Sequence, residues 1–255
     1  MPRRAAVLPL ALVCCSMVLP SCSRSGPTGS AADGGEIHTQ SLKAYLAFPV
    51  GYDSTLAYPL LVALHGNGGS AADFAPVFTP FKGESLVVAL AQGEYARSDG
   101  GYSWYYETND PRLWEPYDRR SMNTLVELIG AIRARYRIGK VFVLGFSQGA
   151  SLAYLTGLMN PPLVTGVLAI AGGLPEVDEV GSIVHSQDVA AARGVRVFIA
   201  RGFADAAMPH EAFVAQRDFF TANGYEVTAL EFAGGHYFTA DLVAGIRQWL
   251  RERAR

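Results

Sequence analysis

The chain has 255 residues, of which 50% are hydrophobic and 17% charged, a composition typical of a globular protein with a sizeable buried core. Its formal net charge is −2, and no long run of like charges interrupts the sequence. Nucleic-acid-binding proteins usually carry a basic patch, so this charge balance argues against DNA or RNA as a partner.

The first 22 residues have the pattern of an export signal. Two arginines precede an apolar, uncharged run over residues 5–20, which is shorter than the ~20 residues that a membrane-spanning helix needs. The run ends in Leu-Pro-Ser-Cys22, which resembles a bacterial lipobox, although Pro20 replaces the usual small residue. We therefore expect residues 1–22 to be a lipoprotein-type signal peptide with Cys22 as the lipidated residue; plain cleavage is the alternative.

Lipidation would tether a folded domain to a membrane surface, facing the periplasm or the cell exterior. Cys14 and Cys15 lie inside the signal, so we expect the mature protein to contain neither a disulfide nor a thiol nucleophile. Residues 23–35 are rich in Ser, Gly and Ala and predict a flexible tether. Residues 36–255 form the expected folded domain.

Within that domain, short apolar runs alternate with helical stretches. The runs are apolar throughout, as in parallel strands that are covered on both faces. The expected strands occupy residues 37–49 (one or two strands), 60–64, 86–91, 141–145, 164–171, 195–200 and 226–232. The expected helices occupy residues 119–136, 148–158, 209–223 and 239–251. This alternation predicts a single α/β domain with a mostly parallel, doubly wound sheet of about seven to eight strands and helices on both faces.

The pentapeptide Gly-Phe-Ser-Gln-Gly at residues 145–149 follows an expected strand and precedes an expected helix. A nucleophile elbow requires this context, because the sharp turn exposes the serine hydroxyl above the sheet. The flanking glycines leave room for the adjacent strand and helix, and the helix N-terminus favours developing negative charge. We therefore predict Ser147 to be a nucleophile; a plain strand-to-helix turn is the alternative.

A catalytic triad also needs a histidine and an acid, which follow the serine in the order acid, then histidine in this type of fold. Asp205 and His236 meet this order, and each follows the end of an expected strand, where catalytic groups of open α/β sheets gather. Asp178 is the rival acid, and capping of the helix near Pro209 is the alternative role for Asp205. We interpret the remaining downstream and upstream histidines as surface or structural residues: His38, His185 and His210.

Two backbone N–H groups are needed to stabilise the oxyanion. One is expected from Gln148, the residue after the nucleophile. The second is expected from the glycine-rich run at residues 65–69, with the main-chain N–H of Asn67 as the candidate. We interpret His65 as a residue that holds this loop. No metal site is expected, because the histidines are scattered and the mature body lacks cysteine.

Four motifs together resemble the phospholipase/carboxylesterase family, which includes acyl-protein thioesterases: Leu64-His65-Gly66, the pentapeptide at 145–149, Asp205 with Met208-Pro209, and Gly235-His236. Secreted feruloyl esterases and polyhydroxybutyrate depolymerases share this fold. The resemblance spans residues 40–250 and implies hydrolysis of a small-molecule ester or thioester without a cofactor. The Asn-Gly-Gly that follows Gly66, and the signal segment, depart from cytosolic thioesterases and argue against protein depalmitoylation.

Residues 95–117 form an expected loop that is dense in Tyr and Trp and follows a strand, so it should lie at the active-site end. Its aromatic side chains predict the walls of an acyl or aryl pocket; a loop that packs its own aromatics is the alternative. We assign Tyr102, Trp104 and Met208 as candidate substrate contacts. A carboxylesterase or thioesterase is the preferred function. The alternatives are a serine peptidase of the same fold, a feruloyl or polyester-degrading esterase and, last, a catalytically silent binding protein.

Overall fold

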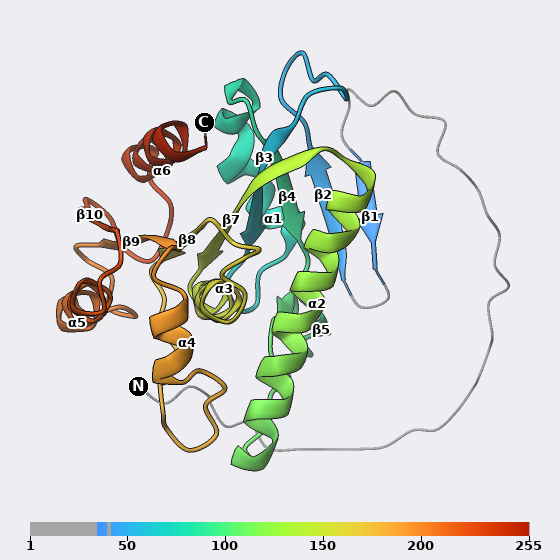
Figure 1. The fold of residues 1–255 in the computed structure, drawn as a ribbon. Helices are drawn as coiled ribbons and strands as arrows, with labels where there is room; N and C mark the ends of the chain where they lie inside the picture. Colours follow the sequence, from blue (N-terminus) through green and yellow to red (C-terminus); the bar gives the residue numbers. More distant parts are fainter. Residues whose placement is uncertain (1–34, 40–41, 255) are drawn as a thin grey trace, which may run out of the picture.

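The main sheet contains eight strands in the order β1-β2-β4-β3-β7-β8-β9-β10 (Figure 1). The computed structural model describes residues 35–39 and 42–254. The expected signal at residues 1–22 and the expected tether, except Gly35, lie outside the described residues. The strands are β1 (Gly35–His38), β2 (Lys43–Ala47), β3 (Tyr58–Leu64), β4 (Val87–Ala91), β7 (Ile138–Phe146), β8 (Gly166–Ile170), β9 (Arg196–Gly202) and β10 (Val227–Phe232).

Strands β4, β3, β7, β8, β9 and β10 are parallel, whereas β1 and β2 add an antiparallel pair at one edge. A small separate hairpin joins β5 (Tyr95–Ala96) to β6 (Tyr102–Ser103). The mostly parallel sheet of a single α/β domain is confirmed. Its connections place the carboxyl ends of β3, β7, β9 and β10, which precede the predicted site residues, along the same edge of the sheet.

Helices cover both faces of the sheet. The helical segments are α1 (Ala71–Phe74), the 3₁₀ helices η1 (Ala75–Gly83) and η2 (Pro111–Leu113), α2 (Trp114–Arg135), α3 (Gln148–Met159), α4 (Ser186–Ala191), α5 (His210–Ala222) and α6 (Ala240–Arg253). Buried side chains of α2, α3, α4 and α5 pack on one face, and those of α1, η1 and α6 pack on the other. Within the described residues, no helix is both long enough and apolar enough to cross a bilayer.

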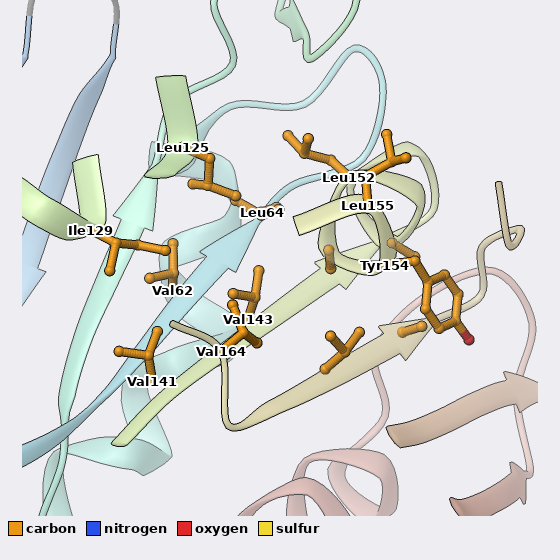
Figure 2. Close-up of a cluster of buried hydrophobic side chains, with 14 of the residues drawn as sticks. Val62, Leu64, Leu125, Ile129, Val141, Val143, Leu152, Tyr154, Leu155 and Val164 are labelled. Atoms are coloured by element: carbon orange, nitrogen blue, oxygen red, sulfur yellow. The ribbon is translucent and has the colours of Figure 1, made fainter. Parts of the chain in front are cut away.

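The uniformly apolar strands explain this two-sided packing. Side chains of successive strand residues point to opposite faces, so Val62 and Leu64 of β3 join one core whereas Leu61 joins the other. Figure 2 shows the first core, where Leu125 and Ile129 of α2 lie over the central strands. All five side chains are fully buried, and each contributes about 1.5–3 kcal/mol of stabilisation.

The long helix begins earlier than expected. Residues 119–136 were expected to be helical, but α2 starts at Trp114, so Trp114 and Tyr117 belong to a helix and not to a loop. Pro116 lies in the first turn, where proline is compatible with a helix because the N–H groups there have no intrahelical acceptor. The prediction of a loop through residue 117 is therefore wrong over its last residues.

Candidate active site

Ser147 lies at the sharp turn between β7 and α3. Its backbone has φ 54° and ψ −115°, a conformation that non-glycine residues rarely adopt and that costs of order 1–3 kcal/mol. The Ser147 N–H donates to the carbonyl oxygen of Ile170 at the end of β8 (2.8 Å), which holds the turn in place. A Cβ atom on Gly145 would lie 2.0 Å from the carbonyl oxygen of Gly149, so the turn requires glycine there. The predicted elbow geometry is present.

Asp205 and His236 are brought together by the loops after β9 and β10. The Asp205 side chain is fully buried, and its Oδ2 lies 2.9 Å from Nδ1 of His236. Its Oδ1 accepts hydrogen bonds from the backbone N–H groups of Ala207 (2.9 Å) and Met208 (3.0 Å). The carboxylate therefore organises its own loop with one oxygen and orients His236 with the other.

The alternative role of Asp205, capping the following helix, is not seen. Helix α5 begins at His210 after Pro209, and no side chain caps it. The two loops that carry the acid and the histidine are also joined directly, because the N–H of Ala204 donates to the carbonyl oxygen of Gly234 (2.9 Å). This bond fixes the spacing of Asp205 and His236.

The imidazole of His236 lies beside the elbow. Its ring centroid is 4.8 Å from that of Phe146, the residue before Ser147, and its side chain is one-third exposed. Within the described part of the chain, the Ser147 hydroxyl forms no hydrogen bond with His236. Catalytic hydrogen bonds in structures without substrate are often long and tighten only in the substrate complex.

Asp178, the rival acid, is engaged elsewhere. Its Oδ1 accepts a hydrogen bond from the N–H of Ser186 (3.1 Å) and lies 3.3 Å from Nδ1 of His185. The hydrogen bonds from Ser186 lower the pKa of the Asp178 carboxyl. Asp205, and not Asp178, is therefore the acid in contact with His236. The other two histidines of the described surface pair with nearby acids: His38 with Glu36 and His210 with Glu231.

The loop after β3 lies directly against Ser147. A Cβ atom on Gly66 would be 3.4 Å from Cβ of Ser147. The N–H groups of Gly68 and Gly69 donate to the carbonyl oxygens of Tyr102 (2.9 Å) and Gly66 (3.0 Å). The N–H of Asn67 donates to no atom of the described residues, and its role as an oxyanion donor stays a prediction.

The two candidate oxyanion donors, Asn67 and Gln148, lie in different local settings. Oδ1 of Asn67 accepts a hydrogen bond from Nη1 of Arg97 (3.2 Å), and Arg97 also pairs with Asp99 and Glu107. Gln148 is the first residue of α3, so its N–H has no acceptor within the helix. The sequence did not indicate Arg97, because its contact with Asn67 joins residues that are 30 positions apart.

His65 holds the loop as a neutral imidazole. It is 1% exposed, and its Nδ1 lies 2.7 Å from the carbonyl oxygen of Gly66, to which it donates. Its Nε2 accepts hydrogen bonds from the N–H of Gly93 (3.0 Å) and from Nε2 of Gln92 (3.2 Å). Burial lowers the pKa of His65, so both ring nitrogens serve the structure in the neutral state.

The three candidate substrate contacts differ in exposure. Tyr102 is half-buried, and its backbone pairs with that of Gly69 beside the expected oxyanion loop. Trp104 and Met208 are buried, at 1% and 3% exposed. Contact with substrate stays a prediction for these residues. Within the described residues, no group of three or more His, Cys, Asp or Glu side chains is arranged to hold a metal ion.

A parallel sheet with a serine elbow after β7, an acid loop after β9 and a histidine loop after β10 defines the α/β-hydrolase class. The chain belongs to the phospholipase/carboxylesterase family, whose model matches residues 52–252, and it is a hydrolase. No curated protein matches the chain closely enough to count as a relative.

Solved structures of esterases are similar in fold. A carboxylesterase from Mesorhizobium loti is 20% identical with a TM-score of 0.68, and the match covers 86% of this chain and 99% of that one. A carboxylesterase from Bacillus cereus is 18% identical with a TM-score of 0.67, over 84% of this chain and 95% of the other. Esterase PE8 is 20% identical with a TM-score of 0.66, over 82% and 97%. At these identities the likeness concerns the fold.

Proposed function

We propose that the protein is a serine carboxylic-ester hydrolase of the carboxylesterase or thioesterase type, with Ser147, His236 and Asp205 as its catalytic triad. The observation that carries the proposal is the 2.9 Å contact between Oδ2 of the buried Asp205 and Nδ1 of His236, next to the serine elbow. When Nδ1 donates its proton to Asp205, Nε2 keeps the lone pair that accepts the proton of Ser147.

In the proposed reaction, Oγ of Ser147 attacks the carbonyl carbon of a small-molecule ester or thioester while His236 takes the hydroxyl proton. His236 then returns this proton to the leaving alcohol or thiol, and the acyl group stays on Ser147. A water molecule, deprotonated by His236, then attacks the acyl carbon; the bond between this carbon and Oγ of Ser147 breaks, His236 returns the proton to Oγ, and the acid is released. The backbone N–H groups of Gln148 and Asn67 stabilise the oxyanion, and each such donor typically contributes about 10²- to 10³-fold in rate.

Labelling with a fluorophosphonate and hydrolysis of p-nitrophenyl esters test this assignment. We expect the label on the peptide that contains Ser147, and a fall of about 10⁶-fold in kcat for Ser147→Ala. Ser151→Ala is the matched control, because Ser151 lies in the first turn of α3, just after Ser147, but donates its hydroxyl hydrogen bond to the carbonyl oxygen of Gly173 (2.8 Å). Labelling at another residue, or full activity of Ser147→Ala, would contradict the proposal.

A substrate panel separates the remaining enzyme classes. Simple acyl esters, acyl thioesters, feruloyl esters, a soluble polyester and amino-acyl amides are compared by kcat/KM. We expect the simple esters or thioesters to be hydrolysed fastest, since the family is that of carboxylesterases and phospholipases. Faster turnover of the amides would instead identify a peptidase.

We also propose that the protein is exported and anchored through a lipid on Cys22. The sequence of the export signal supports this proposal. The strand register also shows at which end of the sheet the chain enters the folded domain. Gly35 pairs with Leu46 of β2, and Ala44 of β2 pairs with Ala91 at the carboxyl end of β4. The chain thus enters the domain at the end of the sheet that is opposite Ser147.

Cys22→Ala tests the anchor. We expect the variant to lose incorporation of labelled palmitate and to leave the membrane fraction, while the folded domain keeps its activity on soluble esters. Unchanged palmitate incorporation would show that Cys22 is not the lipidated residue. Loss of membrane association and of hydrolysis are separate measurements, so the anchor and the reaction are tested independently.

A further inference from the structure

Trp104 joins the two elements that supply the expected oxyanion donors. Its indole Nε1–H donates to the carbonyl oxygen of His65 (2.7 Å), at the start of the loop that carries Asn67. Its backbone N–H donates to Oε1 of Gln148 (2.9 Å), the residue after Ser147. One residue thus bonds to both sides of the candidate oxyanion hole.

Trp104 is itself firmly held. Its side chain is 1% exposed, and its ring centroid lies 4.8 Å from that of His65. Its carbonyl oxygen accepts a hydrogen bond from the hydroxyl of Ser121 on α2 (2.6 Å). The neighbouring Ser103 hydroxyl accepts a second bond from Nε2 of Gln148 (3.0 Å). Trp104 therefore connects the loop and α3 to the long helix α2.

The packing around these bonds leaves little room for movement. A Cβ atom on Gly149, in the first turn of α3, would lie 2.7 Å from the carbonyl oxygen of His65, the acceptor of the indole N–H. The His65 ring is fixed at both nitrogens by Gly66, Gln92 and Gly93. The acceptor that Trp104 binds is therefore held in contact with the start of the nucleophile helix.

We infer that Trp104 is a positioning residue for the oxyanion hole, which sets the distance between the N–H groups of Gln148 and Asn67. This inference rests on the proposed serine hydrolase function. An oxyanion hole stabilises the transition state only when its donors are held in place before the reaction, with errors of about 0.5 Å or less. Here the two donors come from elements about 80 residues apart, so a buried bridge between them fixes a spacing that neither element fixes alone.

Trp104→Phe tests the bridge by removing the indole N–H while retaining an aromatic ring. We expect kcat to fall about tenfold, while KM changes by no more than about twofold. The lost hydrogen bond would displace the oxyanion donors, which stabilise the transition state more than the bound substrate. Affinity for a trifluoromethyl ketone, whose hemiketal oxygen occupies the oxyanion hole, should fall by the same factor. Inhibition by the acid product, which lacks this geometry, should change little.

Trp249→Phe is the matched control. Trp249 lies on α6 and is 3% exposed, and its indole N–H donates to Oγ1 of Thr228 (3.0 Å). The substitution therefore removes an equivalent indole hydrogen bond at a different place in the fold. We expect a similar loss of thermal stability in both variants but no change in kcat for Trp249→Phe. Amide hydrogen exchange should become faster at residues 66–69 in Trp104→Phe only, a readout that needs no substrate.

Gln148→Met provides a second variant should Trp104→Phe fail to fold. It removes the side-chain bond to Trp104 and keeps the backbone N–H of residue 148, so kcat should again fall more than KM rises. Two results would overturn the inference. In the first, Trp104→Phe would match Trp249→Phe both in kcat and in amide hydrogen exchange at residues 66–69. In the second, Trp104→Phe would raise KM and leave kcat unchanged, which would make Trp104 a substrate contact. Failure of Ser147 to react with a fluorophosphonate would refute the proposed function, while the exchange data would still decide whether Trp104 holds the loop.

Discussion

Asp205→Asn separates the two functions that the structure gives to this carboxylate. The asparagine carbonyl oxygen can replace Oδ1 as the acceptor of the hydrogen bonds from the N–H groups of Ala207 and Met208. In the native protein these bonds to Oδ1 are 2.9 and 3.0 Å long. Its NH₂ group then faces Nδ1 of His236, which lies 2.9 Å from Oδ2 in the native protein. Nδ1 must now accept a hydrogen bond, so the ring proton moves to Nε2, and the base that Ser147 needs is lost.

The expected loss in kcat is about 10⁴-fold, as for the corresponding change in serine proteases, which corresponds to about 5.4 kcal/mol in activation free energy. The thermal stability of Asp205→Asn should change little, because both bonds within the loop persist. Asp205→Ala should lose similar activity and also about 1–3 kcal/mol of stability, since it leaves the buried N–H of Met208 without an acceptor.

Steady-state hydrolysis of p-nitrophenyl butyrate, together with thermal unfolding, measures both effects. Asp178→Asn is the control, because it removes the other candidate acid, whose contacts are with Ser186 and His185. Retention of more than about a tenth of the native kcat by Asp205→Asn, or an equal loss in Asp178→Asn, would refute the assignment of Asp205.

Three further substitutions test the strain, the core and the pH dependence. Ser147→Gly should abolish hydrolysis yet raise the free energy of unfolding by about 1 kcal/mol over Ser147→Ala, because glycine adopts φ 54° without strain; equal stability of the two variants would contradict this. Tyr154→Phe should cost about 1–3 kcal/mol in urea unfolding with unchanged kcat, because it leaves the buried Oε1 of Gln216 without its donor (3.1 Å). Burial lowers the pKa of His65, so below pH ~6.5 the unfolded chain binds a proton that the folded protein excludes, and stability falls as the pH falls through the folded pKa. The free energy of unfolding of His65→Asn should depend less steeply on pH over this range than that of the native protein. An equally steep dependence in both proteins would contradict this.

The fold was predictable because its strands have a strong local signal. Apolar runs located the sheet, and the end of β10 was placed at Phe232, as observed. Helices α1 and α4 were missed, since segments of four and six residues are too short to show helical periodicity. The start of α2 was missed because Pro116 and several aromatic residues gave it the composition of a loop.

The candidate site was predictable only as far as it is encoded locally. Ser147, Asp205 and His236 each follow a strand, so topology alone brings them to one edge of the sheet. The bonds of Trp104 to His65 and Gln148 span 39 and 44 positions in the sequence. Such pairings depend on how loops pack in three dimensions, and no motif or periodicity indicates them.

The aromatic segment at residues 95–117 shows why composition alone left two interpretations open. Tyr106 stacks on Tyr117 with ring centroids 4.7 Å apart, and Tyr95 contacts Tyr106 edge-on at 5.7 Å. Self-packing therefore accounts for part of this aromatic density. Tyr102 remains half-buried beside the loop at residues 65–69, so a substrate contact from this segment is still predicted there.

Several buried polar side chains bond to loops around the candidate site, whereas others bond elsewhere, such as Thr156 within α3 and Gln216 to Tyr154. His65, Ser121, Arg201 and Asp205 are buried; His65 and Asp205 bond to loops as described, Ser121 donates to the carbonyl oxygen of Trp104, and Arg201 donates to the carbonyl oxygen of Phe203 (3.1 Å). The apolar core fixes where each strand ends, but only directional bonds fix where the next few residues go. Substitutions in the core should therefore lower stability at constant kcat, whereas substitutions at these polar positions should lower kcat by more than their effect on stability explains.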